Sequence, residues 1–169
     1  RVMIPIGSQP AVLGSALAEH LAGLPDGETV ELADCAVAAN YPFLDPGFPG
    51  LSKVVHEHWG GPVVRRQMRA AEHDYLPIPF SLRFKAFDEA SREERERRRA
   101  TVAMVQVGLP DERGFVSFGP NAWNQLRFVE EADIAIAELN EYIVPAFGAA
   151  HVVHMSKFAA LVVVSSPRK

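Results

Sequence analysis

Residues 101–107 read Thr101-Val102-Ala103-Met104-Val105-Gln106-Val107, an apolar run that lacks the alternation of polar and apolar side chains typical of a half-exposed strand. Residues 134–139, Ile134-Ala135-Ile136-Ala137-Glu138-Leu139, have the same character. A strand that is apolar on both faces is typical of the centre of a parallel sheet covered by helices on both sides. We therefore predict that Val102–Val107 and Ile134–Leu139 are central strands buried on both faces.

Segments with helical periodicity separate the predicted strands. Leucine recurs at helical spacing from Leu13 to Leu24, behind Pro10, and Val2–Ile6 is predicted to be the strand before this helix. Strands that alternate with helical segments imply right-handed crossovers and a mainly parallel sheet. The predicted fold is therefore α/β, with a mainly parallel open sheet and helices on both faces.

The remaining elements are predicted from composition and turn residues. They comprise strands at 29–37, 74–79 and 161–164, helices at 62–73, 81–100 and 121–132, an extended piece at 115–118, and a long loop at 40–61 with at most one short helix near Leu51–His58. In the segment 81–100, acidic residues precede arginines in the favourable i, i+4 order. Arg97, Arg98 and Arg99 are therefore interpreted as a solvated helix face rather than an anion site.

The composition fits one ordinary domain. The chain has 169 residues and a mass of 18.5 kDa, and its formal net charge of −4 disfavours nucleic-acid binding, which depends on attraction to phosphates. The single Cys35 cannot form an intrachain disulfide, and no apolar run reaches the roughly 18 residues of a spanning helix. We therefore expect a cytoplasmic protein. Because the chain begins at Arg1, directly before a strand, we expect residues 1–169 to be one domain of a longer protein.

The loops after the predicted strands are the expected binding region, because ligands of open α/β sheets bind beyond the carboxyl ends of the strands. The first of these loops is Gly7-Ser8-Gln9-Pro10. Its amides and the Ser8 hydroxyl could hold an anion or a carbonyl oxygen, or Ser8 could cap the following helix. The chain contains no Walker loop, no GxGxxG fingerprint and no Gly-x-Ser-x-Gly elbow, so nucleotide hydrolysis, NAD chemistry and serine hydrolysis lose support.

The histidine pairs His56/His58 and His151/His154 could suggest a metal site. Neither pair has the i, i+4 spacing of a zincin helix, and Cys35 has no cysteine partner for structural zinc. We therefore predict that the chain binds no metal.

Two blocks of the sequence resemble a known family. Residues 107–120, VGLPDERGFVSFGP, and residues 132–140, ADIAIAELN, are similar to segments of the acetyl-CoA hydrolases and 4-hydroxybutyrate-type CoA-transferases. The resemblance extends to the strand, loop and helix at 7–17 and to Asp74-Tyr75-Leu76-Pro77, and it continues at Pro145, Gly148, His154 and Ser156. Two features depart from the family pattern: Ala146-Phe147 stands where the family has an arginine, and the gap from Gly148 to His154 is one residue longer.

The resemblance implies the N-terminal domain of a CoA-transferase, whose fold is related to that of ribose-phosphate isomerase. In this family CoA is transferred between an acyl group and a carboxylate through a glutamyl-CoA thioester, or the thioester is hydrolysed by water. The nucleophilic glutamate lies in a second domain, so no residue of this chain is assigned as catalytic. The implied substrates are an acyl-CoA and a small carboxylate, with no tightly bound cofactor. The implied partners are a second CoA-transferase domain or subunit and other copies of the protein in a homo-oligomer.

The resemblance also suggests substrate-contacting residues, each with a structural alternative. These candidates are Ser8, Gln9, Asn140 and His154. Asn140 could instead be a turn residue, and His154 a hydrogen-bonded core histidine. A different interpretation keeps the fold and drops catalysis, as a binding or scaffolding subunit, and the apolar loop 142–147 would suit its interface. A sugar-phosphate isomerase is disfavoured because the sequence lacks a clustered Lys/Asp/Glu site.

Overall fold

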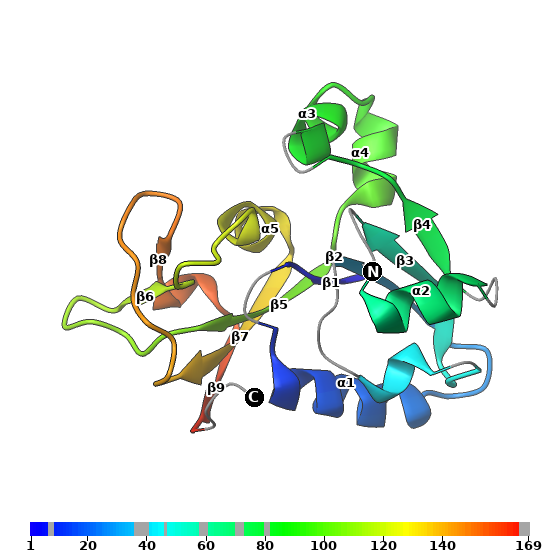
Figure 1. Ribbon diagram of the computed structural model, residues 1–169, viewed down its shortest axis with the longest axis horizontal. Helices are drawn as coiled ribbons and strands as arrows, with labels where there is room; N and C mark the ends of the chain where they lie inside the picture. Colours follow the sequence, from blue (N-terminus) through cyan, green and yellow to red (C-terminus); the bar gives the residue numbers. More distant parts are fainter. Residues whose placement is uncertain are drawn as a thin grey trace.

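A computed structural model of the chain describes residues 1–6, 9–35, 41–45, 47–57, 61–69, 73–79 and 82–165. Its main feature is a parallel sheet of seven strands in the order β4-β3-β2-β1-β5-β7-β9 (Figure 1). The strands of this sheet are β1 (Val2–Ile4), β2 (Val30–Cys35), β3 (Leu51–Glu57), β4 (Asp74–Leu76), β5 (Val102–Val107), β7 (Ile134–Asn140) and β9 (Ala160–Val164). The helices are α1 (Ala11–Ala22), α2 (Pro62–Arg69), α3 (Arg83–Asp88), α4 (Arg92–Arg98) and α5 (Gln125–Glu131).

The two strands that define the fold in the sequence lie at the centre of this sheet. β5 pairs with β1 on one side and with β7 on the other, in a register that places Gln106 opposite Glu138. All residues of β5 after Val102 are buried. The predicted mainly parallel α/β fold with buried central strands is therefore confirmed.

Helices cover both faces of the sheet, as predicted. Figure 1 shows α1 on one side of the sheet and α3, α4 and α5 on the other. The face toward α1 contributes Ile4, Leu32 and Val54 to one hydrophobic cluster. The residues that alternate with them, such as Met3 and Ala33, pack with Phe84 of α3 and Phe128 of α5 on the opposite face. Each strand thus sends alternate side chains into two separate cores.

The segment 51–57 corrects one prediction. Residues Leu51–His58 were expected to hold at most a short helix, whereas Leu51–Glu57 form β3, which is paired with β2 and β4. The physical reason is the pair Val54 and Val55, because β-branched side chains favour an extended chain and here fill the sheet on its two faces. The many prolines and glycines before this segment concealed the strand.

The single helix predicted at 81–100 is also wrong, because the segment forms two helices, α3 and α4, with a break at residues 89–91. Ser91 starts α4, and its hydroxyl accepts a hydrogen bond from the amide of Glu94 at 3.2 Å. Of the expected i, i+4 pairs, Glu94 and Arg98 lie 3.6 Å apart. Asp88, which the i, i+4 order would pair with Arg92, pairs with Arg127 of α5.

Other element boundaries are shorter than predicted. The strand at 74–79 ends at Leu76, and the helix at 121–132 is limited to Gln125–Glu131. Of the helix predicted at 62–73, Pro62–Arg69 is confirmed as α2 and residues 70–72 lie outside the described residues. In the part of the chain that the structure describes, no helix is both long enough and apolar enough to cross a membrane.

A second, antiparallel sheet packs beside the main one. It consists of β6 (Phe115–Ser117) and β8 (Val152–His154), and β8 was not predicted. The turn before β6 is held by Asp111, whose carboxylate accepts hydrogen bonds from the amides of Phe115 at 2.8 Å and Arg113 at 3.0 Å. These hydrogen bonds, the one from Phe115 above all, lower the pKa of Asp111. The block 107–120 that carries the family resemblance thus builds this turn and its strand.

Candidate functional site at the carboxyl edge of the sheet

The strand order places a candidate site at the carboxyl ends of β1, β5 and β7. From β1 the chain runs to β2 and then outward to β3 and β4, whereas β5 lies on the other side of β1. The direction in which successive strands are added to the sheet therefore reverses between β1 and β5. Open α/β sheets bind ligands at such a switch point. The helix α1 begins at this edge, after the loop that follows β1.

A buried carboxylate holds the start of α1 at this edge. Glu138 of β7 is fully buried, and its two oxygens accept hydrogen bonds from the amides of Leu13 at 2.6 Å and Ala11 at 3.2 Å. A third hydrogen bond comes from the side-chain amide of Gln106 on β5, at 3.0 Å. Glu138 therefore ties two central strands to the N-terminal end of α1, where a negative charge is favoured.

This arrangement changes the interpretation of the first loop. The amides of Ala11 and Leu13 already donate to Glu138, and the N-cap residue of α1 is Pro10, whose side chain makes no capping hydrogen bond. Ser8 lies outside the described residues, so both roles considered for it in the sequence, helix cap and substrate contact, stay untested. A ligand at this edge would need donors other than those two amides.

Tyr41 also holds the N-terminal end of α1. Its hydroxyl donates to the carbonyl oxygen of Pro10 at 2.9 Å, and its ring stacks on Phe43 with 4.8 Å between ring centroids. The ring lies directly against Gly14, where a Cβ atom would stand 2.1 Å from Cε1 of Tyr41. The first turns of α1 are thus held between Tyr41 and Glu138.

We expect Gly14→Ala to lower the free energy of unfolding by about 1–3 kcal/mol, because the added methyl overlaps a buried ring. The gain of about 1 kcal/mol from alanine's higher helix propensity opposes this loss. Urea denaturation measures the difference, with Gly23→Ala at the end of the same helix as control. At Gly23 an added Cβ would meet its nearest neighbour at an ordinary 3.5 Å. Equal effects of the two substitutions would contradict the proposed contact.

The structure brings two of the four predicted site residues to the carboxyl edge. Gln9 is half-buried in the loop before α1, and Asn140 ends β7, two residues beyond Glu138. The side-chain oxygen of Asn140 accepts a hydrogen bond from the amide of Tyr142 at 2.9 Å. Asn140 therefore also has the turn-forming role that the sequence left open.

His154 lies in a different part of the fold. It ends β8 in the antiparallel sheet, opposite Phe115, and its ring meets Phe115 edge-on. Its Nδ1 atom lies 2.7 Å from the hydroxyl oxygen of Ser156. Gly114 lies against the same ring, because a Cβ there would be 2.8 Å from Nε2 of His154. These contacts link His154 to the turn of the block 107–120.

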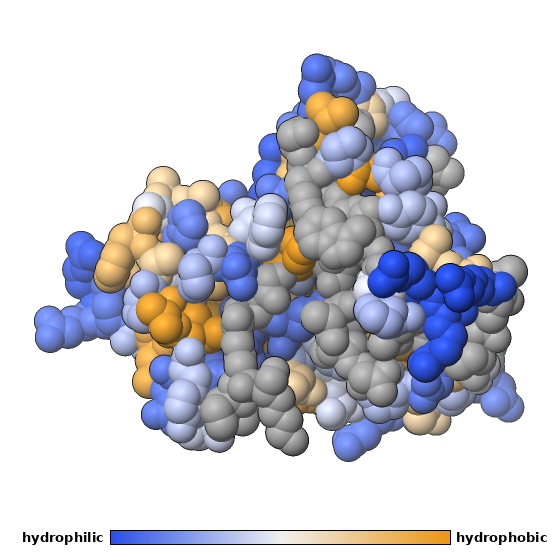
Figure 2. All heavy atoms as spheres, in the orientation of Figure 1, coloured by the Kyte–Doolittle hydropathy of each residue, from blue (hydrophilic) through white to orange (hydrophobic). Residues whose placement is uncertain are grey.

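The loop 142–147 carries exposed hydrophobic side chains beside this edge. Val144 is 70% exposed and Phe147 88% exposed. Ser117 of β6 anchors the loop, because its hydroxyl donates to the carbonyl oxygen of Ala146 at 2.9 Å and accepts from the Ala146 amide at 3.0 Å. Figure 2 shows hydrophobic residues gathered on the lobe that carries β6 and β8. The loop is therefore held in place by hydrogen bonds and exposes apolar side chains to solvent.

The histidines form a pair different from those considered in the sequence. Nε2 of His56, at the end of β3, lies 2.8 Å from Nδ1 of His73. Burial and the neighbouring His56 lower the pKa of His73 to about 4, so its ring is neutral at neutral pH. Among the described residues, no group of three or more His, Cys, Asp or Glu side chains could hold a metal ion. His58 lies outside the described residues.

Glu138 and Gln106 were not identified as site residues in the sequence. Both stand in runs that are otherwise apolar, and a charged residue inside a buried strand needs a hydrogen-bonding partner. That signal was present in the sequence. The partners themselves depend on the strand register and on where α1 begins, which the sequence pattern does not give.

Comparisons with known proteins agree with this architecture. No protein-family model matches the chain. Over 67 residues, 39% of this chain and 15% of the relative, it is 40% identical to a butyryl-CoA:acetate CoA-transferase from Anaerostipes caccae. Among solved structures, RipA from Yersinia pestis superposes with a TM-score of 0.72 at 21% identity, over 98% of this chain and 39% of that chain. A 4-hydroxybutyrate CoA-transferase from Porphyromonas gingivalis gives 0.56 at 21% identity, over 91% of this chain and 38% of that chain.

The strand order and these matches define an open parallel α/β domain whose fold is similar to that of a 4-hydroxybutyrate CoA-transferase. The resemblance to the CoA-transferase family found in the sequence is confirmed, and the chain is similar to an N-terminal domain of that family. The chain spans about two fifths of the length of the solved structures that it matches.

Proposed function

We propose that this chain is the N-terminal domain of an acyl-CoA:carboxylate CoA-transferase or acyl-CoA hydrolase that works through a glutamyl-CoA thioester. The observation that carries the proposal is the match of 40% identity over 67 residues to a butyryl-CoA:acetate CoA-transferase. The shared fold with a 4-hydroxybutyrate CoA-transferase supports it. In this proposal the nucleophilic glutamate lies outside residues 1–169, in a second domain or subunit.

The chemistry of the proposal divides the work between two domains. A carboxylate attacks the thioester carbonyl of acyl-CoA, and CoA is held for a time on the enzyme's glutamate as a new thioester. A carboxylate acceptor then takes the CoA, or water hydrolyses the thioester. The developing oxyanions need fixed hydrogen-bond donors. The first domain would supply one wall of this cleft, at the carboxyl edge where α1 begins.

Within that wall, the proposed substrate-contacting residues are Ser8, Gln9, Asn140 and His154. The position of Gln9 and Asn140 at the carboxyl edge supports their assignment. His154 has weaker support, because it lies in the antiparallel sheet with β6. The exposed apolar loop with Val144 and Phe147 suits a contact with the second domain.

The proposal is tested by enzymology on residues 1–169 alone and on a polypeptide that includes the second domain. The isolated chain is expected to leave an acyl-CoA intact in the presence of acetate and to form no enzyme thioester that hydroxylamine can trap. Thioester turnover by the isolated chain, at the rate of the longer polypeptide, would contradict the placement of the glutamate. Absence of turnover in the longer polypeptide would contradict the proposed activity.

In the longer polypeptide, Ser8→Asp is expected to lower the transferase rate by about tenfold or more, because a new carboxylate would repel the acceptor carboxylate. Ser8→Ala should have a smaller effect of the same sign. If Ser8 only caps α1, Asp should replace it without loss. The matched control is Ser15→Asp, which adds the same charge at an exposed position of α1. Near-normal turnover of Ser8→Asp would remove Ser8 from the proposed site.

A further inference from the structure

A hollow of about 420 Å³ lies on the sheet face opposite α1, over β2, β3 and β4. Glu31 of β2 and Lys53, Val55 and Glu57 of β3 line its floor, because these residues alternate with those that face α1. Its volume is within the range of small-molecule sites. The other lining residues come from the start of β1, from β4 and the segment after it, and from α3 and α4: Arg1, Asp74, Tyr75, Leu76, Ile78, Arg83 and Arg98.

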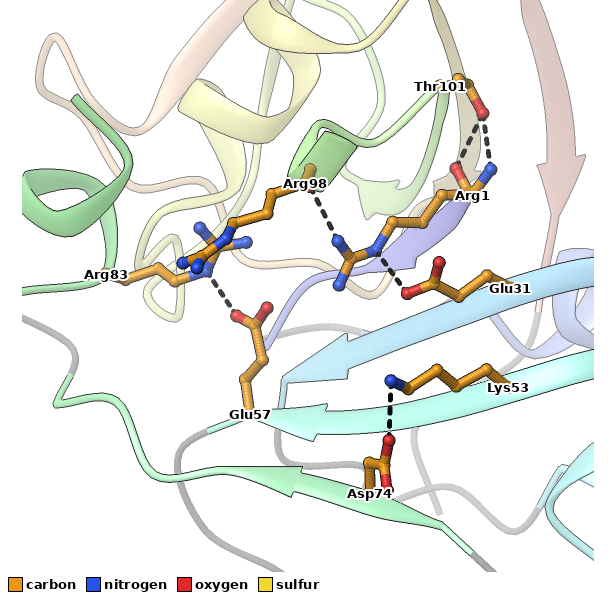
Figure 3. Close-up of polar contacts among 8 residues, drawn as sticks. All are labelled: Arg1, Glu31, Lys53, Glu57, Asp74, Arg83, Arg98 and Thr101. Carbon is orange, nitrogen blue, oxygen red and sulfur yellow. Dashed lines mark hydrogen bonds and ion pairs between the residues drawn. The ribbon is translucent and has the colours of Figure 1, made fainter. Parts of the chain in front are cut away.

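Three ion pairs between different elements build the walls of this hollow (Figure 3). Arg83 of α3 pairs with Glu57 at 2.5 Å, Lys53 pairs with Asp74 of β4 at 2.7 Å, and Arg1 pairs with Glu31 at 3.4 Å. The first pair is buried, with 7% and 1% of its two side chains exposed. The buried pair therefore fixes the Arg83 wall of the hollow before any ligand binds.

Arg83 presents unused donors to the hollow. Its contact with Glu57 is made through Nε, so the two terminal amino groups have no acceptor among the described residues. The guanidinium also lies 5.5 Å from the ring centroid of Phe84 and 5.4 Å from that of Phe128, which limits its movement. A buried guanidinium with a free edge is suited to bind a carboxylate or phosphate through two parallel hydrogen bonds.

Arg98 gives the hollow an excess of positive charge. The lining residues include four cations and three carboxylates, and each carboxylate is paired with one of the other three cations. Among the described residues, the Arg98 side chain forms an ion pair with Glu94 on its own helix, at 3.6 Å and with both side chains more than two fifths exposed, and the Arg98 carbonyl oxygen accepts a hydrogen bond from Arg1. Figure 3 shows the Arg98 side chain extending toward the Arg83 end of the hollow. Arg98 is thus the one lining cation whose carboxylate partner lies outside the lining of the hollow.

We propose that this hollow is a binding site for a small organic monoanion with an apolar tail. Its oxyanion head would accept hydrogen bonds from the terminal amino groups of Arg83 and lie beside Arg98. Its tail would lie along Val55, Leu76 and Ile78, which also line the hollow. The site is on the sheet face, apart from the carboxyl edge, so the inference goes beyond the proposed function and does not depend on it. The sequence assigned Arg98 to a solvated helix face, and this proposal assigns it to the hollow instead. Arg99, from the same prediction, forms an ion pair with Asp133 and donates a hydrogen bond to the carbonyl oxygen of Glu131.

The experiment is calorimetric titration of the chain with three probes, followed by ¹H–¹⁵N spectra. Sodium pentanoate carries both the charged head and the tail, pentanol only the tail, and inorganic phosphate only a charged head. Pentanoate is expected to bind with a Kd of about 1 mM and to shift the amide signals of β3 and α4. Pentanol and phosphate should each bind about tenfold more weakly, because each lacks one half of the contacts. Equal binding of phosphate and pentanoate would overturn the apolar part of the proposal, and no saturable pentanoate binding would overturn it entirely.

Variants locate the site. Arg98→Gln is expected to weaken pentanoate binding about fivefold, because it removes a positive charge that no carboxylate of the hollow pairs with. Arg83→Lys should weaken it more, since lysine keeps the charge toward Glu57 and loses the forked donors. Arg92→Gln is the matched control, because Arg92 is exposed on the same helix and does not line the hollow. If Arg83→Lys fails to fold, Arg98→Gln still decides, because its side chain is 42% exposed. Equal binding by Arg98→Gln and the unmodified chain would contradict the assignment.

Discussion

Replacing Glu138 by alanine is expected to lower the free energy of unfolding by about 3–5 kcal/mol, because three donors lose an acceptor that is itself fully buried. Those donors are the amides of Ala11 and Leu13 and the side chain of Gln106. An unsatisfied buried donor costs about 1–3 kcal/mol, and entry of water would recover part of the loss. The measurement is chemical denaturation followed by circular dichroism.

The isosteric variant Glu138→Gln separates shape from charge. Glutamine fills the same space but presents one acceptor oxygen and an amino group to three donors, so we expect an intermediate loss of about 1–3 kcal/mol. Glu130→Ala is the control, because Glu130 is exposed on α5. If Glu138→Ala were as stable as Glu130→Ala, Glu138 would not hold the start of α1.

The central part of the fold could be predicted from the sequence because its signal is local. The strands at 102–107 and 134–139 are apolar on both faces, and only a sheet covered on both sides accommodates such runs. β3 was missed because its sequence lacks such a local signal. Its amino-terminal half is exposed at Ser52 and Lys53, and only Val54 and the residues after it are buried, so neither an alternating nor a continuous apolar pattern appears.

The candidate site was less predictable because its contacts join residues far apart in the chain. Glu138 reaches Leu13 across 125 positions, and in the separate hollow on the sheet face Arg83 reaches Glu57 across 26. Rules of local spacing give the type of partner that a buried charge needs but not the position of that partner. The break between α3 and α4 differs, because Ser91 and Glu94 form a local capping signal that was present in the sequence.

Breaking the ion pair between Glu57 and Arg83 is the second large effect that we expect. Glu57→Leu should lower the free energy of unfolding by about 3–5 kcal/mol, because it leaves a buried guanidinium without its carboxylate. The exposed pair Lys53–Asp74 provides the comparison, and Asp74→Asn should cost less than about 1 kcal/mol. Urea denaturation of both variants measures the contrast, and similar losses would show that Arg83 is solvated in the folded protein.

The double variant Glu57→Leu/Arg83→Met distinguishes stability from ligand binding at this pair. Apolar side chains of similar volume often replace a buried ion pair with little loss or with a gain, so the double variant is expected to recover most of the stability lost in Glu57→Leu. It should still fail to bind pentanoate, because the forked donors of Arg83 are gone. A double variant as unstable as Glu57→Leu would mean that the packing of Arg83 against Phe84 and Phe128, rather than its charge, stabilises this face. A stable double variant that binds pentanoate normally would place the anion site elsewhere.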